Sequence, residues 1–552
     1  MARWKHTAVP LLLALSVAAA TPALAAERPA AVHHTVRAPV QAADDAGQAE
    51  AVTQAGEQSM SSADPPAERR TLLRYARDTW RSFDAMVVPA TGLPADYIGG
   101  DLAPGTRSGY TSPTNVGGYL WSTVAARDLG VIGAPEADRR VRQTLDTLGR
   151  LSFHEPSGMF YNWYDPATGT VLRTWPEDGS VVHPFLSSVD NGWLAAALMV
   201  VRSAMPDRAA QAQHLLGRMD FGFFYDPQGR GADFPAGLLR GGFWDEEPPG
   251  CSVTGNYRDR GPDVWYTCNH YDILNTEPRI ASYVGIALGQ IPAKHYYAPY
   301  RTFPASCDWS WPEQRPVGFT TSYLGVPVFE GSFTYRGHRF VPTWGGDMFE
   351  AMMPAMFVPE ERWGPRSWGL NHPAYVQGQI AHGLNDAKYG YWGFSPASDP
   401  RGGYAAWGVD AMGMDPTGYP SDLEGTDVDL GYEGCRPAQP AKPFGDGVVT
   451  PHASFLALPY AQHAAVDNLQ RLERDFDSYG PGGFYDAVAV RSGTVARRYL
   501  ALDQAMVLGP IGNALSRDDI RGYFSRGEVE RAIRPLLARE RFSAGRAAGT
   551  GR

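Results

Sequence analysis

Apolar side chains recur every three to four positions in twelve separate stretches of the chain. This spacing gathers the apolar side chains on one face of a helix. Ser, Thr, Asp or Pro stands at many of the starts, as is typical of helix N-termini. The predicted helices cover residues 68–86, 113–129, 134–150, 188–204, 207–219, 278–288, 348–357, 373–389, 452–458, 461–476, 500–515 and 526–538.

A short aromatic phrase returns between the helical pairs, at residues 158–165, 221–226 and 482–486. Each copy indicates a brief strand that ends in an Asp turn. The intervals are too irregular for an open solenoid, so a closed ring explains them better. We therefore predict an all-α fold, an (α/α)6 toroid of paired helices with short β-hairpins and long loops on one rim. The longest loops, 221–276 and 292–343, are expected to stand over one mouth of the ring.

The N-terminus has the composition of a secretory signal peptide. Arg3 and Lys5 precede an apolar run at 9–20, and Ala23-Leu24-Ala25 supplies small residues for cleavage, so residues 1–25 are the predicted signal. The apolar run is shorter than the roughly 20 residues that a membrane span requires. We expect a secreted extracellular protein without a membrane span.

Three further segments follow the predicted signal. Residues 26–66 are rich in Ala, Pro, Gln and acids, a composition that favours a disordered linker. Residues 67–542 contain no internal polar linker, so we predict one large catalytic domain there. Residues 543–552 are expected to form a disordered tail.

Four cysteines remain after removal of the signal, and an even number in an exported protein favours disulfides over metal or redox use. Three pairings are possible. We favour Cys251 with Cys268 and Cys307 with Cys435, because the first pair brackets one loop. Four buried thiols are the alternative.

Charge and aromatic content narrow the class of partner. The net charge of −10 has the wrong sign for binding a phosphate backbone, which argues against nucleic acid. The chain holds 15 Trp, 27 Tyr and 23 Phe, and many of them stand beside Gly and carboxylates in loops. Flat rings next to hydrogen-bonding groups suit sugars. For any single ring, filling the core of a loop-rich fold is the alternative.

Several catalytic motifs are absent from the sequence. There is no Gly-x-Ser-x-Gly elbow, no His-Glu-x-x-His, no phosphate-binding Gly-x-x-x-x-Gly-Lys and no dinucleotide fingerprint. Carboxylates set among Gly, aromatic residues and amides remain. Cleavage of a glycosidic bond needs little else, because one protonated acid and one base or nucleophile suffice.

Longer phrases then resemble a known family. Thr111-Ser-Pro-Thr-Asn-Val-Gly-Gly-Tyr-Leu120, the run at 187–195, Gly345-Gly-Asp-Met-Phe-Glu350 and the runs at 391–404 and 502–513 resemble the glucoamylase-like domain family. That family includes bacterial endo-β-1,2-glucanases and the related domain of cyclic β-1,2-glucan synthases. The similarity spans most of residues 71–537 in the same order. It implies an (α/α)6 fold, no catalytic metal or cofactor, and inversion at the anomeric carbon by two separated carboxylates.

Asp190 occupies the motif in which the resemblance implies the general acid, usually a Glu. A helix N-terminus lowers the pKa of a carboxyl group, so an acid at this position needs burial or a neighbouring negative charge to keep its proton. The alternative role is structural, because Ser187-x-x-Asp190 is also a capping box.

Asp399 matches the position of the general base in the resemblance, within a Gly-rich loop after Trp392. An inverting site holds its two carboxyl groups roughly 6.5–9.5 Å apart, and a loop allows such a separation. The alternative is an Asp-Pro-Arg-Gly turn in which Asp399 caps its own backbone. Glu350 is the third catalytic candidate, and it becomes the preferred acid if Asp190 only caps its helix.

Other acidic residues have weaker patterns. Asp410 and the stretch Asp422, Glu424, Asp427, Asp429 and Glu433 fail the spacing of an EF-hand. A solvated loop is favoured there over a calcium site, and no metal site is predicted.

Substrate contacts are expected from polar and aromatic residues inside the family phrases. Packing in the core is the alternative for Trp193 and Tyr404, while His183 and Arg107 are weaker polar candidates. The predicted substrate-binding residues are Tyr110, Asn115, Asn191, Trp193, Trp344, Trp392 and Tyr404.

The leading interpretation is a monomeric, metal-independent glycoside hydrolase that cleaves a β-linked glucan, with β-1,2-glucan favoured, by inversion. Hydrolysis of another cell-envelope or environmental polysaccharide stays open, because the loops that decide the substrate lie outside the matched phrases. A polysaccharide lyase is a third possibility, since α/α toroids also serve that chemistry. The fourth is a non-catalytic glycan-binding protein, in which Asp190, shorter than the Glu usual at this position, no longer supports catalysis.

Overall fold

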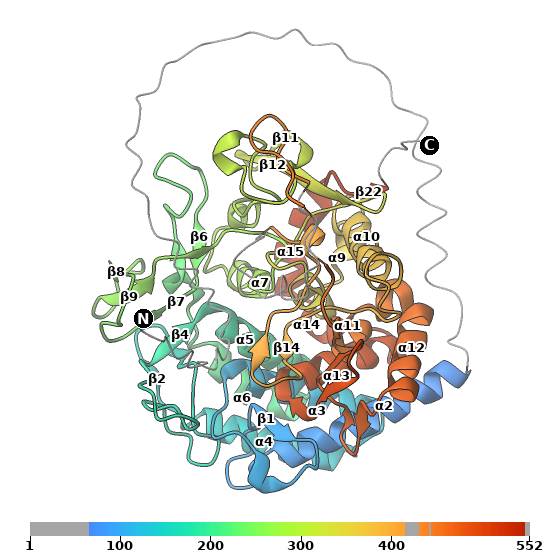
Figure 1. The fold of residues 1–552 in the computed structure, drawn as a ribbon. Helices are drawn as coiled ribbons and strands as arrows, with labels where there is room; N and C mark the ends of the chain where they lie inside the picture. Colours follow the sequence, from blue (N-terminus) through green and yellow to red (C-terminus); the bar gives the residue numbers. More distant parts are fainter. Residues whose placement is uncertain (1–65, 415–429, 441–442, 547–552) are drawn as a thin grey trace, which may run out of the picture.

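The computed structural model describes residues 66–414, 430–440 and 443–546 (Figure 1). The predicted signal peptide and nearly all of the predicted linker lie outside these ranges. So do Asp422, Glu424, Asp427 and Asp429 of the acidic stretch. Within the described ranges, no helix is long and apolar enough to cross a membrane.

A set of inner helices is buried over most of its length. Such helices carry small or apolar residues on all sides instead of a single stripe, which is typical of helices surrounded by protein. In the described part of the chain they are α3 (Pro113–Asp128), α5 (Ser188–Ala204), α7 (Arg279–Ala287), α8 (Met348–Met352), α11 (Pro451–Leu456) and α13 (Ala501–Leu515).

The inner helices contact one another in a closed cycle. Helix α3 packs on α5 and α5 on α7, while α8 packs on α11, α11 on α13 and α13 on α3. The guanidinium of Arg279 closes the remaining step, because its Nη1 and Nη2 donate to the carbonyl oxygens of Glu350 (2.8 Å) and Ala351 (2.7 Å) on α8.

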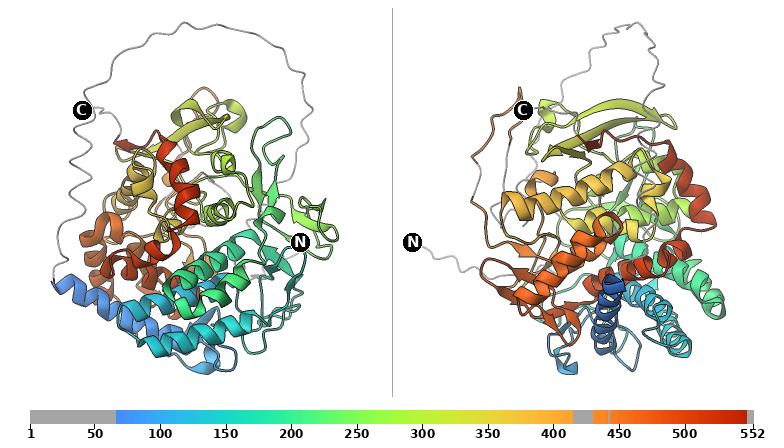
Figure 2. Two further views of the ribbon diagram at one scale, coloured as in Figure 1. Left: turned by 180° about the vertical axis from the view of Figure 1, so that it is seen from behind. Right: turned by 90° about the vertical axis from the view of Figure 1, so that its right-hand side faces the viewer.

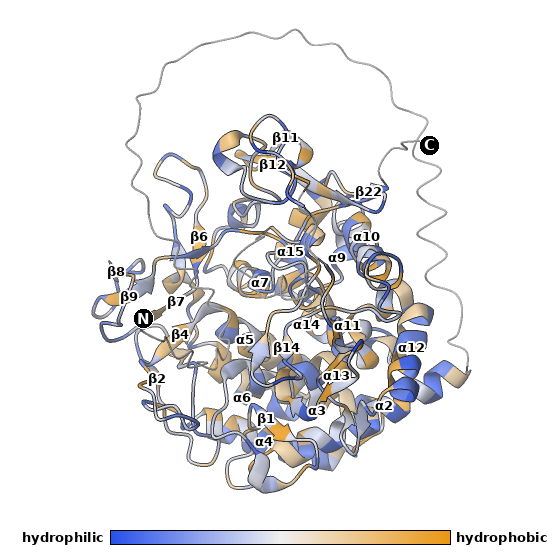
Figure 3. Cartoon of the chain, in the orientation of Figure 1, coloured by the Kyte–Doolittle hydropathy of each residue, from blue (hydrophilic) through white to orange (hydrophobic). Residues whose placement is uncertain are grey.

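A second set of helices packs outside this cycle, one against each inner helix. Most of them bury a single face, and the outward turns of α2 and α12 are largely hydrophilic (Figure 3). In cycle order they are α4 (Ala134–Leu148) on α3, α6 (Ala209–Leu216) on α5, α15 (Glu528–Arg539) on α7, α10 (Trp368–Ala381) on α8, α12 (Leu458–Asp475) on α11 and α2 (Pro66–Met86) on α13.

Each of the twelve stretches predicted from the sequence overlaps an α-helix, so their existence is confirmed, although α10 begins five residues before the predicted stretch 373–389 and ends eight residues before its end. Two short helices were not predicted, α9 (Glu360–Trp363) and α14 (Asp519–Phe524). Both are too short to display a helical period, because they span about one turn and a turn and a half.

Strands are more numerous than predicted, so the all-α description is only partly confirmed. The described residues contain eight small sheets, and every strand pair in them is antiparallel. The smaller sheets pair β1 (Tyr97–Gly99) with β21 (Arg498–Leu500), β2 (Phe153–His154) with β3 (Met159–Phe160), β14 (Ala397–Ser398) with β15 (Tyr404–Ala405), and β17 (Tyr479–Gly480) with β18 (Gly483–Phe484).

The larger sheets have three or four strands. The aromatic phrases predicted as strands contain β3, β5 and β18, which confirms those predictions. The sheet orders are β10 (His270–Tyr271), β6 (Leu238–Arg240), β5 (Tyr225–Asp226); β16 (Val448–Val449), β19 (Ala487–Ala489), β20 (Thr494–Ala496); β4 (Phe185–Ser187), β7 (Gly242–Trp244), β9 (Val264–Thr267), β8 (Ser252–Gly255); and β11 (Val317–Tyr323), β12 (Val326–Tyr335), β13 (His338–Phe340), β22 (Gly545–Arg546).

The segment at 292–343, predicted as a long loop, contains the largest hairpin. Strands β11 and β12 stand at one end of the molecule, beyond the helices (Figure 2). Their two-residue turn places Leu324 (φ 50°) and Gly325 (φ 79°) in the left-handed region, as a type I′ turn requires. Strand β22 continues this sheet, so residues 545–546 of the expected tail pair with β13.

Both predicted disulfides are present. Cys251 and Cys268 join the paired strands β8 and β9, with a Cα–Cα distance of 5.8 Å. Cys307 and Cys435 connect segments that lie 128 residues apart, with a Cα–Cα distance of 5.3 Å. The second bond therefore fixes the chain after the acidic stretch to the segment that precedes β11.

Candidate functional site

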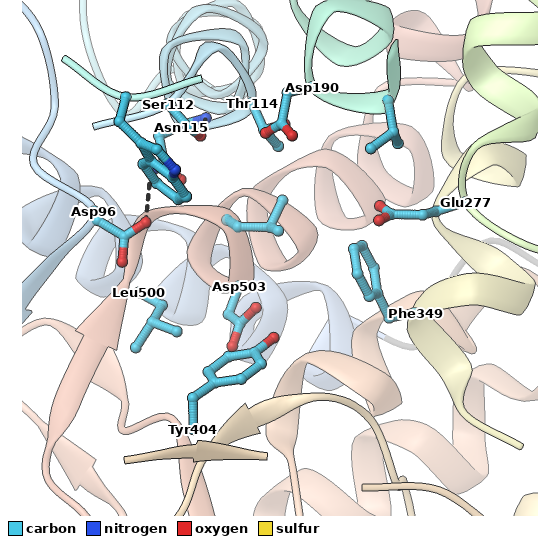
Figure 4. Close-up of a pocket in the computed structure, with 13 residues that line it drawn as sticks. Asp96, Ser112, Thr114, Asn115, Asp190, Glu277, Phe349, Tyr404, Leu500 and Asp503 are labelled. Carbon is cyan, nitrogen blue, oxygen red and sulfur yellow. Dashed lines mark hydrogen bonds between the residues drawn. The ribbon is translucent and has the colours of Figure 1, made fainter. Parts of the chain in front are cut away.

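The N-terminal ends of five of the six inner helices surround one pocket (Figure 4). Helices α3, α5, α7, α8 and α13 all begin at its wall, because the cycle is built with these helix starts at one mouth. Side chains with carboxyl, hydroxyl and amide groups alternate with aromatic rings. The lining residues are Asp96, Ser112, Thr114, Asn115, Trp163, Val189, Asp190, Glu277, Phe349, Tyr404, Leu500, Leu502 and Asp503.

Asp190 both belongs to the cap of its helix and lines the pocket. Its backbone N–H donates to Ser187 Oγ at 3.1 Å, which is the predicted cap of α5. Its carboxyl group accepts a hydrogen bond from Thr114 Oγ1 at 2.5 Å, and the residue is only 7% exposed. Burial raises the pKa of Asp190, while hydrogen bonds from Thr114, Ser187 and Ser112 oppose the rise. The two roles weighed in the sequence therefore occur together.

Glu277 is a second acid on the same side of the pocket. It stands two residues before α7, is 4% exposed, and accepts a hydrogen bond from Trp193 Nε1 at 3.1 Å. Burial raises the pKa of Glu277 well above its usual range, and the charges of Asp190 and Glu350 raise it further. Because Asp190 is the strongest of these neighbouring charges, the two carboxyl groups compete for protons. We call Asp190 and Glu277 the α5–α7 wall.

The opposite side holds acids with other partners. Asn115 Nδ2 donates to Asp96 Oδ1 at 2.7 Å. Burial raises the pKa of Asp96 to about 6, the hydrogen bond from Asn115 lowers it, and the charges of Glu177 and Asp486 raise it. We call Asp96 and Asn115 the α3 wall.

Asp503, at the start of α13, lies between the two walls (Figure 4). It is 2% exposed, and burial raises its pKa well above the usual range, with the charge of Asp486 next in importance. Asp486 also accepts a hydrogen bond from the backbone N–H of Ser398 at 2.7 Å, so it connects this acid with strand β14.

The other two predicted catalytic residues lie outside the pocket lining. Glu350 Oε2 accepts from the backbone N–H groups of Trp344 (2.9 Å) and Gly345 (3.2 Å), and burial raises the pKa of Glu350. Asp399 Oδ1 accepts from the N–H of Arg401 at 2.8 Å, in the turn between β14 and β15. The catalytic roles of Glu350 and Asp399 stay predictions.

Of the predicted substrate contacts, Asn115 and Tyr404 line the pocket. Trp193 is fully buried and orients Glu277, as described above. Tyr110 is also buried and packs on Trp175, with ring centroids 4.5 Å apart. Asn191 binds backbone instead, since its Nδ2 donates to the carbonyl of Phe160 at 2.9 Å.

The remaining candidates also have structural contacts. The backbone N–H of Trp392 donates to Asn468 Oδ1 at 3.2 Å, and its ring is 2% exposed. Trp344 is half-buried in an aromatic cluster outside the pocket. His183 lies 3.6 Å from Glu246, and Arg107 Nε donates to the carbonyl of Ala85 at 2.6 Å.

Of the thirteen lining residues, Asp190, Asn115 and Tyr404 were predicted as site residues, and the other ten, among them the acids Asp96, Glu277 and Asp503, were missed. Glu277 directly precedes Pro278 at a predicted helix start, and this position was the sequence signal that could have identified it as a site residue. Trp163 belongs to an aromatic phrase that was assigned to a strand only. Asp96 lies in a loop with no helical or family pattern, so no sequence signal was used for it. In the described ranges, no group of three or more His, Cys, Asp or Glu residues is placed to hold a metal ion.

Comparisons of sequence confirm the family resemblance. Residues 326–520 match the family model described as "Putative glucoamylase", and residues 74–223 match a model described as a protein of unknown function. The chain is 23% identical over 604 aligned positions to the cyclic β-(1,2)-glucan synthase NdvB of Rhizobium meliloti. The match covers 84% of this chain but 18% of that synthase, so the chain spans about a fifth of the relative's length.

Comparisons of structure identify the same fold in solved glucanases. The endo-β-1,2-glucanase of Chitinophaga pinensis, in complex with sophorotriose and glucose, is similar with a TM-score of 0.56 and 16% identity over 85% of this chain and 98% of that one. The endo-β-1,2-glucanase of Talaromyces funiculosus with sophorose has a TM-score of 0.55 and 13% identity, over 86% and 88% of the two chains.

Proposed function

We propose that this glucoamylase-like chain is a secreted glycoside hydrolase that cleaves a β-linked glucan, with β-1,2-glucan favoured, on an (α/α)6 toroid and with inversion. The observation that carries the proposal is the pocket, in which Asp190 and Glu277 face a separate carboxyl group of Asp96 (Figure 4). Hydrolysis by inversion requires a protonated acid and an ionised base in one cavity. The similarity to endo-β-1,2-glucanases supports the choice of substrate.

Asp190 is the proposed general acid. A helix N-terminus lowers the pKa of Asp190, but burial raises it and so favours the protonated form. The α5–α7 wall then holds a proton at neutral pH, and Asp190 transfers it to the glycosidic oxygen as the bond breaks. Thr114 orients the carboxyl group through its hydrogen bond.

Asp96 is the proposed general base among the pocket residues. With a pKa of about 6, it is largely ionised at pH 7, and Asn115 fixes one of its oxygens. The ionised carboxylate removes a proton from a water molecule, which attacks the anomeric carbon on the face opposite the leaving group. Asp399 is the alternative base predicted from the sequence. Its Oδ1 already accepts a hydrogen bond from the backbone N–H of Arg401, which favours Asp96 over Asp399 as the base.

The proposal is tested with the purified chain and a panel of linear and cyclic β-glucans, arabinans and galactans, by following new reducing ends. We expect release of oligosaccharides from linear β-1,2-glucan. Activity on a different polymer alone would contradict the choice of substrate. No new reducing ends from any polymer would contradict the hydrolase itself, and unsaturated products absorbing in the ultraviolet would indicate a lyase.

A further inference from the structure

An aromatic cluster that includes an exposed indole lies outside the pocket. Trp311 is 38% exposed, and it is the only Trp among the exposed large hydrophobic residues of the described ranges. Its ring centroid lies 5.0 Å from that of Phe303 and 6.1 Å from that of Trp344. Phe303 in turn stacks on Trp309, with centroids 4.5 Å apart and planes 5° apart. We call these four rings the aromatic platform.

The side chain of Arg436 binds the backbone on both sides of Trp311. Arg436 Nε donates to the carbonyl of Ser310 at 2.6 Å, and Arg436 Nη2 donates to that of Pro312 at 2.6 Å. The adjacent Cys435 is bonded to Cys307, so a covalent link secures the same two segments. An exposed ring that is already fixed loses little conformational entropy when a ligand binds. Simple core packing would not require this ring to face solvent.

The platform continues from the pocket along the chain that leads into α8. Phe349 lines the pocket, and the next residue, Glu350, accepts the backbone N–H of Trp344 at 2.9 Å. Trp344 then contacts Trp311. These contacts connect the platform with the α8 side of the pocket.

We propose that Trp311 forms a distal subsite, in which its indole stacks on a glucosyl unit of the β-linked glucan beyond the units held in the pocket. This inference rests on the proposed function, because it assigns the ligand of the same site. The axial C–H groups of a β-glucosyl ring present an apolar face that matches an indole, while its hydroxyls stay in water. The platform thus makes binding depend on the length of the chain.

The experiment measures the affinity of the full chain for linear β-1,2-glucan polymer and for the β-1,2-linked disaccharide, by calorimetry. The parent carries Asp190→Asn, so that the ligands persist during titration. Trp311→Ala is expected to weaken polymer binding roughly tenfold, which is the scale of one lost aromatic contact. The disaccharide should bind as in the parent, and Trp311→Tyr, which keeps a ring, should retain most of the affinity.

Phe319→Ala is the matched control, because Phe319 is 39% exposed on strand β11 and belongs to no part of the platform. Unchanged polymer affinity in Trp311→Ala would overturn the inference. So would an equal loss for the disaccharide, an equal loss in Phe319→Ala, or a parent that does not bind the polymer. Hydrolysis by the unmutated chain is recorded separately, so polymer binding without cleavage would contradict the proposed function and leave the subsite in place.

Discussion

The α5–α7 wall and the α3 wall place the same chemical group in two different environments. Asp190 and Glu277 are almost fully buried, which raises the pKa of both carboxyl groups, and the charge of Asp190 raises that of Glu277 further. Asp96 is half-buried, and Asn115 stabilises its ionised form through a hydrogen bond. Burial raises the pKa of all three carboxyl groups. The difference is one of degree: the charges of Asp190 and Glu350 add to burial at Glu277 and raise its pKa well above the usual range, whereas the pKa of Asp96, which Asn115 lowers through a hydrogen bond, reaches about 6.

The largest expected effect comes from removing the acid of the α5–α7 wall. Asp190→Asn keeps the size of the side chain and the cap formed by Ser187, but it has no proton to transfer to the leaving group. We expect kcat on linear β-1,2-glucan to fall about 10³-fold. The melting temperature serves as the control and should stay close to that of the unmutated chain. Activity at the unmutated rate would remove Asp190 from the chemistry and return Glu350 as the candidate.

Removing the base of the α3 wall should have the next largest effect. Asp96→Asn is expected to lower kcat/KM about 10²-fold, because water is no longer activated. Asp399→Asn is the matched comparison and should change kcat/KM by less than about threefold, since that carboxylate is engaged in its own turn. The reverse ranking of the two variants would transfer the role of base to Asp399.

The pH profile of the unmutated chain tests the α3 wall without a mutation. Because the base must be ionised and the pKa of Asp96 is raised to about 6, kcat/KM should decline as the pH falls below 6. The expected decline is about tenfold per pH unit on the acidic limb. A profile that stays flat down to pH 4 is incompatible with Asp96 as the base.

The smallest effect is expected from Glu277, whose pKa is raised by burial and by the charge of Asp190, and which is proposed to share a proton with Asp190. Glu277→Gln retains the hydrogen bond from Trp193 Nε1 but removes the negative charge. The pKa of Asp190 should then fall, so the alkaline limb of the kcat profile should move to lower pH, with a loss of activity of several-fold at pH 7. Movement of that limb to higher pH would show that the two acids are not coupled in this way.

The inner and outer helices were predictable because each one carries its own local period, and many also carry a start signal. The capping pattern Ser187-x-x-Asp190 located a helix start, and the family phrases identified Asp190 and Asn115 as site residues. A local sequence pattern predicts one helix at a time. Such patterns identify the candidates on a ring but not which of them face one another.

The remaining features depend on contacts between distant segments. Asp96 enters the pocket because its loop lies beside α3, which no local period encodes. Glu277 lines the pocket because α7 packs against α5 and because Trp193, 84 residues earlier in the chain, donates a hydrogen bond to its carboxyl group. The strands β11 and β12 were missed because the turn at Leu324 and Gly325 was taken as part of a loop, although burial alternates over the first residues of β12.

The most direct test of the proposed inversion at the two-wall site is the anomeric form of the first product. Time-resolved proton NMR of linear β-1,2-glucan with the unmutated chain should detect the α-anomer before mutarotation, because water attacks opposite to a β-linked leaving group. The same experiment with Asp190→Asn should show almost no product over that interval. First appearance of the β-anomer, or an equal product signal from Asp190→Asn, would contradict the account.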